Sequence, residues 1–369
     1  MCAHKILSFS VVILLLTVLF AGVATVPVVA QYDTMQYRYN AQHTGYYGPV
    51  AGSNVSSGKP TWNYRIGGEV RSSPAVVNGV VYVGSYDHNV YALNATTGAK
   101  LWNYTTGRYV FSSPAISNGV VYVGSFDHNV YALNATTGAK LWNYTTGGSV
   151  LSSPAVDNGS VYVGSDDNNV YALNATTGAK VWSYTTGYEV NSSATVDNGS
   201  VYVGSDDNNV YALNATTGAK LWNYTTGDRV ESSPAVDNGV VYVGSYDNNV
   251  YALNATTGAK VWSYATGGIV DASPAVVNGT VYVGSVYNSV YALNAATGAK
   301  VWSYTTRGCV ESSPAVANGV VYVGGDDYNL YAIGNAAAIG NAAAATPGFE
   351  VVIAFIGLVI ATYAVRRKR

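Results

Sequence analysis

Three carboxylates recur at one position of a 40-residue repeat, and their spacing suggests electrostatic chemistry. They are Glu231, Asp271 and Glu311. If the units are arranged in a ring and the strand that carries these residues is the innermost of its unit, the three carboxylates lie next to one another at the mouth of the central channel. Like charges in such a place raise one another's pKa and attract cations or basic groups. The alternative is that they point into bulk water, too far apart to couple. The first three units have Arg71, Phe111 and Leu151 there, so we expect an apolar and basic sector opposite the acidic arc.

Histidines and paired aspartates resemble metal ligands when each is considered in isolation. His88 and His128 follow an aspartate in neighbouring units, but a zinc site needs three or four ligands in fixed geometry. Other units have Asn168, Asn208 and Asn248 at the same place. The pair Asp166-Asp167 could bind Ca²⁺, yet Asx turns that cap a hairpin explain it more simply. We therefore predict that these residues form turns and that the chain has no metal site.

The element that must position these side chains is a repeat marked by tryptophan. All the tryptophans lie 40 residues apart, at Trp62, Trp102, Trp142, Trp182, Trp222, Trp262 and Trp302. Each unit has four short Val/Tyr-rich runs, separated in part by Asn-Gly and Thr-Gly, which supply the left-handed conformations of tight hairpins. In the second unit the predicted strands are residues 110–116, 120–124, 130–134 and 140–145. One four-stranded sheet per 40 residues is typical of a propeller blade.

The number of units predicts an all-β, seven-bladed propeller of four-stranded antiparallel blades over residues 60–333. Seven sets of first-to-third strands begin at Val70, Val110, Val150, Val190, Val230, Val270 and Val310. The seventh set ends at Ile333 without a tryptophan strand, whereas residues 60–66 are a tryptophan strand with no set before it. Pairing the two in one shared blade closes the ring with the N-terminal strand and covers edges that would otherwise promote aggregation.

Residues 92–102, ALNATTGAKLW, resemble a known inter-blade motif. It is the tryptophan-docking motif, A-x-[DN]-x-x-T-G-x-x-x-W, of pyrroloquinoline-quinone-dependent dehydrogenases and their non-enzymatic relatives, including the outer-membrane assembly lipoprotein of Gram-negative bacteria. In that family the indole packs against the glycine peptide and alanine of the neighbouring motif. The resemblance implies that the tryptophans are structural. Because those relatives usually have eight blades, it also leaves eight blades possible here.

The resemblance does not extend to a catalytic site. Quinoprotein enzymes hold their cofactor with Ca²⁺, an aspartate base and a pair of adjacent cysteines. This chain has only Cys2 and Cys309, and its nearly interchangeable units carry no large insertions. Since a fold does not fix a function, we expect no enzymatic activity and no cofactor. A quinoprotein-like oxidoreductase is the least favoured alternative.

The N-terminal end indicates export. Residues 1–30 contain Lys5, an apolar run and a small-residue end at Ala30, which together predict a secretory signal peptide rather than a retained span. Cys2 would leave with the signal, so Cys309 has no partner and no disulfide framework is expected. Residues 31–59 are predicted to form an arm that lies against the propeller.

The C-terminal end indicates anchoring at the cell surface. Residues 334–349 form a linker that ends in a Pro-Gly-Phe box, and residues 350–369 contain an apolar run before Arg-Arg-Lys-Arg. The run would span about 22 Å as a helix, short of the roughly 30 Å hydrocarbon core. The segment resembles the PGF-CTERM sorting signal of archaeal surface proteins, which implies removal by an archaeosortase and attachment to a lipid. A plain C-terminal anchor is the alternative, and both place the propeller at the outer face of the cytoplasmic membrane.

Differences among the units gather on one face, which we call the variable face. It is formed by the loop that leads into each first strand and the loop between the second and third strands. Its candidate ligand-binding residues are Arg71, Tyr86, Tyr109, Phe111, Phe126, Glu189, Asn191, Arg229, Glu231, Tyr246, Asp271 and Glu311. Variation on one face of a repeat scaffold indicates a binding surface. Neutral drift after recent duplication would produce the same pattern.

The charge of the expected mature region restricts the class of partner. Between residues 31 and 349 the chain has 13 basic and 19 acidic residues, a net charge of −6 without a basic stripe. This argues against a nucleic-acid partner. We predict a monomeric, membrane-tethered surface module that binds a protein or a glycan. A structural component of the cell envelope is the alternative.

Sequons of the form N-x-[ST] occur along most of the repeat. They begin at Asn54, Asn94, Asn103, Asn134, Asn143, Asn158, Asn174, Asn191, Asn198, Asn214, Asn223, Asn254 and Asn278. Turn chemistry alone explains those inside the docking motif. Export to a surface makes glycosylation of some of the others an expectation.

Overall fold

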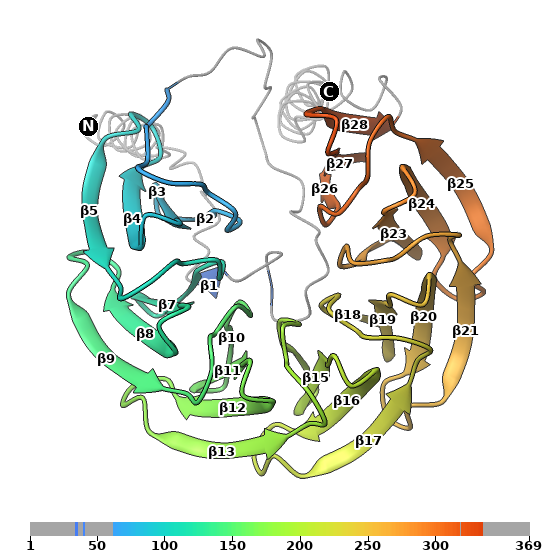
Figure 1. Cartoon of the computed structure of the whole chain (residues 1–369), viewed down its shortest axis with the longest axis horizontal. Coiled ribbons are helices and arrows are strands. Elements are labelled where there is room, and N and C mark those ends of the chain that lie inside the picture. Colours follow the sequence, from blue (N-terminus) through green and yellow to red (C-terminus); the bar gives the residue numbers. More distant parts are fainter. Residues whose placement is uncertain (1–33, 36–39, 41–61, 318, 335–369) are drawn as a thin grey trace, which may run out of the picture. The chain divides into compact units, whose positions relative to one another are not determined.

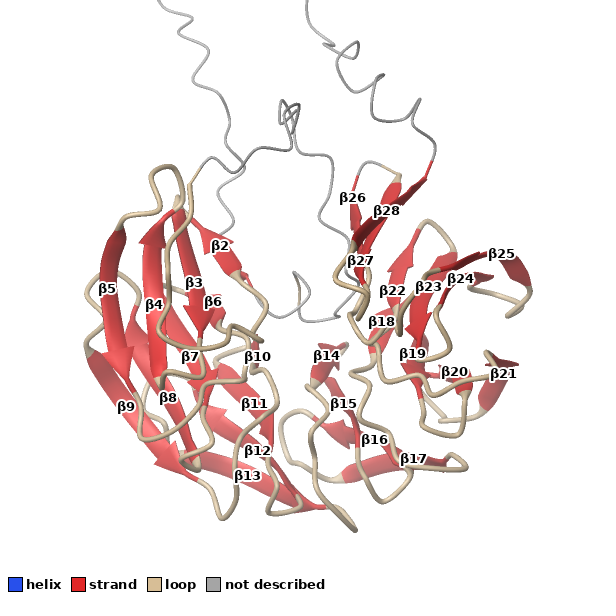
Figure 2. Ribbon diagram, turned by 45° about the horizontal axis from the view of Figure 1, so that its top comes forward, coloured by secondary structure: helices blue, strands red, loops and turns tan. Residues whose placement is uncertain are grey.

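The computed structural model describes residues 34–35, 40, 62–317 and 319–334 of the 369-residue chain. The elements in these ranges are all β-strands (Figure 2). Within them, no helix is long and apolar enough to cross a membrane. The expected signal peptide, C-terminal tail and most of the linker and N-terminal arm fall outside the described residues, so those predictions stay predictions here.

In the described part of the chain the strands form seven consecutive antiparallel sheets, each of which is one blade. Blade one contains β2 (Ala75–Val77), β3 (Val80–Gly84), β4 (Asn89–Asn94) and β5 (Lys100–Thr105). Blade two contains β6 (Ala115–Ser117), β7 (Val120–Gly124), β8 (Asn129–Asn134) and β9 (Lys140–Thr145). Blade three contains β10 (Ala155–Asp157), β11 (Ser160–Gly164), β12 (Asn169–Asn174) and β13 (Lys180–Thr185).

The remaining blades repeat this pattern, except that β23 is one residue longer than its equivalents and the described part of blade seven has three strands. Blade four contains β14 (Thr195–Asp197), β15 (Ser200–Gly204), β16 (Asn209–Asn214) and β17 (Lys220–Thr225). Blade five contains β18 (Ala235–Asp237), β19 (Val240–Gly244), β20 (Asn249–Asn254) and β21 (Lys260–Ala265). Blade six contains β22 (Ala275–Val277), β23 (Thr280–Ser285), β24 (Ser289–Asn294) and β25 (Lys300–Thr305). Blade seven contains β26 (Ala315–Ala317), β27 (Val320–Gly324) and β28 (Leu330–Gly334).

The order of the strands within a blade is the expected one, with the first strand innermost. Neighbouring blades touch through their first strands, for example β10 against β14 and β14 against β18. The fourth strands, such as β13 and β17, lie at the outer edge (Figure 1). A two-residue strand of the N-terminal arm, β1 (Thr34–Met35), pairs with the inner edge of β6. The all-β, seven-bladed propeller predicted from the sequence is therefore confirmed.

The first strands are shorter than predicted because the residues before them bond between blades rather than within one. β6 begins at Ala115 instead of residue 110. The amide of Ser113 donates to Oγ of Ser153 in the next blade at 3.0 Å, and the amide of Ser153 donates to Oγ of Ser193 at 2.9 Å. Equivalent bonds join the inner segments from Ser73 to Ser313 at 2.8–3.1 Å. This series, which we call the serine belt, links every consecutive pair of blades.

Within the described residues, six of the seven tryptophans, from Trp62 to Trp262, dock onto the blade that follows them through a backbone carbonyl. The indole Nε1 of Trp102 donates a 2.9 Å hydrogen bond to the carbonyl of Ala135, and the hydroxyl of Tyr82 donates to the same oxygen at 3.1 Å. Gly138 has a φ of 72°, and a Cβ there would lie 2.7 Å from the Trp102 ring. Glycine is required for both reasons. The indole-to-carbonyl bond recurs at 2.8–3.0 Å from Trp62 to Trp262.

The seventh blade differs from the others in its outer strand. Among the described residues its sheet has three strands, and residues 62–66 carry no strand assignment. Those residues pack on blade one, where Trp62 donates to the carbonyl of Ala95. The expected fourth strand is thus not in place on β28, and Leu330 is 77% exposed where the equivalent Val90 is 0% exposed. Closure by the N-terminal strand stays a prediction.

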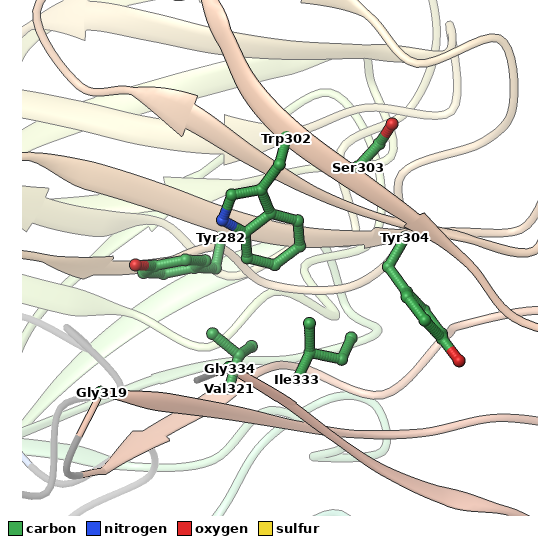
Figure 3. A pocket seen from close by; sticks show the side chains of 8 residues that line it. All are labelled: Tyr282, Trp302, Ser303, Tyr304, Gly319, Val321, Ile333 and Gly334. Carbon is green, nitrogen blue, oxygen red and sulfur yellow. The ribbon is translucent and has the colours of Figure 1, made fainter. Parts of the chain in front are cut away.

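A cavity of about 440 Å³ lies between blades six and seven (Figure 3). Its lining includes Tyr282, Trp302, Val321 and Ile333. Between other blades this place receives the turn whose carbonyl accepts the indole, 33 residues after the tryptophan. The residue at that distance from Trp302 is Asn335, which is outside the described range.

Trp182→Ala should lower the free energy of unfolding by about 3–5 kcal/mol. The substitution removes a ring that is 8% exposed, together with its hydrogen bond to the carbonyl of Ala215. Urea and thermal unfolding measure the change. Ser183→Ala, at the exposed neighbouring position of β13, is the control and should leave the midpoint almost unchanged. An unchanged midpoint in Trp182→Ala would contradict the docking role.

Deletion of residues 31–66 tests closure of the ring. We expect this variant to aggregate and to unfold at a lower temperature, because the first blade would lose residues 62–66, which pack on it, and no strand would remain to close the ring at the edge of β28. Size-exclusion chromatography with light scattering measures the state of assembly. A monodisperse monomer with the parent's melting temperature would rule out the shared blade.

Candidate functional site

The loops of the variable face are held by one aspartate in each of six blades. In blade three, Oδ2 of Asp167 accepts hydrogen bonds from the amide of Gly147 and the hydroxyl of Tyr171, both at 2.6 Å. Oδ1 accepts from the amide of Asn169 at 3.1 Å. Burial alone would raise the pKa of Asp167, but the hydrogen bonds from Tyr171, Gly147 and Asn169 outweigh it and lower that pKa. This aspartate therefore ties the two loops of the variable face together.

The histidines occupy turn positions, as the sequence predicted. His88 and His128 have φ values of 71° and 70°, close to the 70° of Asn168 at the same place in blade three. This left-handed conformation is the one that asparagine tolerates best among residues with side chains. Within the described residues, no group of three or more His, Cys, Asp or Glu side chains could hold a metal ion.

The acidic arc brings together carboxylates from neighbouring blades. Burial and, to a smaller extent, the negative charges of Glu231 and Glu311 together raise the pKa of Asp271 to about 7. The charge of Arg229 acts in the opposite direction. Because the carboxylates of three consecutive blades influence one titration, they share one electrostatic environment. The alternative that they are too far apart to couple does not describe Asp271.

The arc extends further than the sequence indicated. Burial raises the pKa of Asp206 to about 6, assisted by the charges of Glu231 and Glu189 and opposed by Arg229. The pKa of Asp166 is also raised, first by burial and then by Glu189. The full acidic arc is Asp166, Glu189, Asp206, Glu231, Asp271 and Glu311. The sequence places Asp166 and Asp206 in the loops of the variable face, but it does not distinguish them from turn residues because each directly precedes the aspartate that makes the turn.

One arginine partly compensates the arc. The guanidinium of Arg229 lies 3.9 Å from the ring centroid of Tyr246, and its Nε is 3.1 Å from Oε1 of Glu231. The Tyr246 hydroxyl donates to Oε2 of Glu231 at 3.1 Å. The sequence prediction placed these three residues on one face, and the structure brings them into direct contact. Arg229 therefore offsets part of the negative charge at Glu231.

Two polar atoms within the arc lack hydrogen-bond partners among the described residues. They are Oδ1 of Asn191 and Oδ1 of Asp206, both buried. Their side chains meet through a long contact of 3.5 Å between Nδ2 of Asn191 and Oδ2 of Asp206. Buried acceptors without a donor cost about 1–3 kcal/mol each. A hydrogen-bond donor placed next to these two oxygen atoms would remove that cost.

Aromatic side chains of blades one and two form a second group on the variable face, which we call the aromatic sector. The ring centroid of Tyr109 is 4.9 Å from that of Tyr86 and 6.0 Å from that of Phe126, and Phe111 lies 6.3 Å from Tyr86. Tyr109 is 41% exposed. These distances are those of favourable aromatic pairs.

The basic character expected for this sector is weaker than the sequence suggested. Arg71 lies 5.2 Å from the Tyr86 ring, but its Nε is also 3.0 Å from Oε2 of Glu69. Because the neighbouring carboxylate compensates its charge, the sector is mainly aromatic.

The site of a quinone cofactor is not reproduced by these residues. Besides the missing metal-ligand group in the described ranges, the sequence has no adjacent cysteines. Cys309 lies half-buried in the loop before β26. The chemistry of pyrroloquinoline quinone with Ca²⁺ therefore does not fit the donor set of this chain.

Asp271→Asn should raise the melting temperature at pH 8 and have little effect at pH 4. A carboxyl group whose pKa is raised from 3.8 to about 7 stabilises the folded state below pH 3.8, and that contribution is lost as the pH rises to about 7. The amide removes the cost of ionisation. Thermal unfolding between pH 4 and pH 9 measures the difference. Asp157→Asn, on the opposite face, is the control, and equal midpoints of Asp271→Asn and the parent at pH 8 would contradict the raised pKa of Asp271.

Comparison with known sequences identifies the repeat and the tail. The family model described as "Outer membrane protein assembly factor BamB" matches residues 39–116, 105–195, 186–272 and 265–342. The PGF-CTERM motif matches residues 346–368. No curated protein sequence matches the chain. The two resemblances drawn from the sequence are confirmed, and the second supports an exported, membrane-anchored propeller.

Solved structures share the fold at low identity. BamB from Moraxella catarrhalis is 23% identical with a TM-score of 0.65, and the match covers 74% of this chain and 85% of that one. The computationally designed Ika8 protein is 18% identical with a TM-score of 0.67, covering 72% and 84%. A europium-containing methanol dehydrogenase is 15% identical with a TM-score of 0.66, covering 82% and 85%. At these identities the likeness concerns the fold alone, whereas the family match extends over most of the sequence. The chain therefore belongs to the PQQ-like β-propeller repeat family described by the assembly factor BamB.

Proposed function

We propose that the variable face binds a protein or glycan ligand at the cell surface, and that the chain is a binding or adhesion module rather than an enzyme. The observation that carries this proposal is the acidic arc, where the buried Oδ1 atoms of Asn191 and Asp206 have no hydrogen-bond partner among the described residues and Arg229 is the one arginine paired with a carboxylate of the arc. The raised pKa of Asp271, about 7, is consistent with this crowding of carboxyl groups. Clustered carboxylates repel one another, so a fold without a ligand to bind gains nothing from them. The same cluster attracts a cationic group of a ligand and favours its desolvation.

The aromatic sector supports the same face as the contact surface. Tyrosine and phenylalanine supply large contact areas with little loss of side-chain entropy, and they are enriched where proteins bind partners. Exposed tyrosines also occur in the loops of other blades, with Tyr188 at 55% and Tyr287 at 70% exposure. A ligand that carries basic groups beside apolar ones would complement both sectors. The family description names an assembly factor, a role exercised on other proteins, and this favours a protein ligand.

The absence of an enzymatic role is part of the proposal and rests on the donor set. The arc offers carboxylates, one arginine and one tyrosine, but no adjacent cysteines and no nucleophile paired with a base. Anchoring at the outer face of the cytoplasmic membrane would present the propeller to the exterior.

Neutralising the arc should remove most of the attraction for cationic ligands. The variant combines Glu231→Gln, Asp271→Asn and Glu311→Gln, and the probe is a fluorescent decalysine peptide followed by anisotropy between 20 and 300 mM NaCl. We expect the parent to bind at low salt and to lose affinity as salt is added, because exposed charges are screened beyond about 10 Å at 0.1 M. The triple variant should bind about tenfold or more weakly at the lowest salt.

The matched control changes the same number of charges on the opposite face. It combines Asp157→Asn, Asp197→Asn and Asp237→Asn, which occupy one hairpin position in three consecutive blades. This variant should bind decalysine almost as the parent does. If the two triple variants lose affinity equally, net charge rather than the arc is responsible and the proposal fails. A glycan array and a pull-down from cell envelopes with the same three proteins then identify the class of ligand.

A further inference from the structure

The sequons of the described residues fall into distinct structural classes. One class lies in the turn after the third strand, at Asn94, Asn134, Asn174, Asn214 and Asn254. There Oδ1 of Asn134 accepts from the amides of Thr136 and Thr137 at 3.0 and 2.9 Å. The next residue, Ala135, supplies the carbonyl that receives the Trp102 indole. A saccharide on Asn134 would therefore stand beside a contact between two blades.

A second class lies in the hairpin between the first and second strands, at Asn158, Asn198 and Asn278. These residues have φ values of 44°, 45° and 48° and precede a glycine, so the sequon is folded into a tight turn. Nδ2 of Asn158 also donates to Asp157 at 2.9 Å. Asn191 stands apart, half-buried in the acidic arc with its Oδ1 enclosed. None of these sites offers an extended acceptor sequence.

The third class lies in the outermost strands β5, β9 and β17. Asn103 and Thr105 of β5 are both exposed, and their separation of two residues places both side chains on the same face of the strand. The Asn103 amide donates to Oδ1 of Asn89 at 3.0 Å, and the Thr105 hydroxyl donates to the same oxygen at 2.7 Å. The sequon amide and hydroxyl thus meet on the solvent side of an edge strand. Identical contacts occur around Asn143 and Asn223.

We propose that, among the sequons of the described residues, Asn103, Asn143 and Asn223 are the N-glycosylation sites of the exported protein. The reaction joins Nδ2 to the anomeric carbon of a saccharide and breaks the bond from that carbon to the phosphate of a glycosyl-phospholipid donor. The amide releases one proton, and the phosphate leaves with the bonding electron pair. A saccharide at these positions extends into solvent without displacing a contact between blades.

The neighbouring residues give the modification a physical role. Each of the three strands has leucine two residues before the sequon asparagine, and Leu101, Leu141 and Leu221 are 50%, 51% and 50% exposed. The outer strands of blades three, five and six have valine and serine in these two places instead, as in Val181 and Ser183. A glycan beside an exposed leucine on an unpaired strand covers apolar surface and blocks pairing with another chain. The larger apolar side chain and the sequon occur together in all three strands.

Peptide mapping of the full chain, purified from a host that exports and N-glycosylates proteins, tests this assignment. Mass spectrometry after proteolysis should find at least tenfold higher occupancy at Asn103, Asn143 and Asn223 than at the turn and hairpin sequons. Asn103→Gln should remove one saccharide mass and leave the melting temperature unchanged. Unmodified peptides at all three positions, or equal occupancy of the turn sequons, would overturn the proposal.

A gain of modification provides the sharper test. Ser183→Asn completes the sequon N-Y-T in β13, a strand that now lacks one, and should add one saccharide mass. Ser263→Asn in β21 is its matched control, because Ala265 leaves that sequon incomplete. If Ser183→Asn is folded but unmodified while the turn sequons carry glycans, exposure on an outer strand is not the deciding property. Since the mapping does not involve the variable face, its outcome is independent of the proposed ligand binding.

Discussion

Six tryptophan-mediated contacts in the described part of this propeller each depend on one backbone carbonyl. The oxygen of Ala135 accepts hydrogen bonds from the Trp102 indole and the Tyr82 hydroxyl, and both donors belong to the preceding blade. The two bonds fix the distance and the rotation of one blade relative to the next. They also explain why Gly138 cannot carry a side chain, because the indole occupies the place of its Cβ. The strand lengths, the turn types and the 40-residue period all keep this contact in register.

Fixing the junctions near the outer edge and along the serine belt leaves the loops of the variable face free to differ. Those loops are held together by a single aspartate, such as Asp167, whose carboxylate accepts hydrogen bonds from the neighbouring loop and strand. In blade six, Tyr287 replaces that aspartate and is 70% exposed. The Tyr291 hydroxyl, which has lost its carboxylate partner there, donates instead to the carbonyl of Thr266 at 2.7 Å. The fold persists because the docking contacts are independent of the loops.

The sequence predicts the fold well because the periodic residues are the structural ones. Tryptophan, Asn-Gly and Thr-Gly each have one physical use here, and the first-to-fourth strand order follows from them. The site is predicted less completely. The arc of Glu231, Asp271 and Glu311 follows from equivalent positions in successive units, whereas Asp206 joins it from a different loop. Contacts between two loops depend on how blades are packed, and no spacing within one unit contains that information.

Each contact between blades has two different sides, since one blade supplies the donors and the next supplies the acceptor. The interface is therefore heterologous, and every copy uses nearly the same surfaces. A whole unit removed or inserted between two others leaves all remaining junctions chemically intact. Only the curvature needed to bring the two ends together limits how many units such a chain holds. The number of blades is thus a property of ring geometry rather than of any junction, and recombination between near-identical gene segments is free to change it in whole steps.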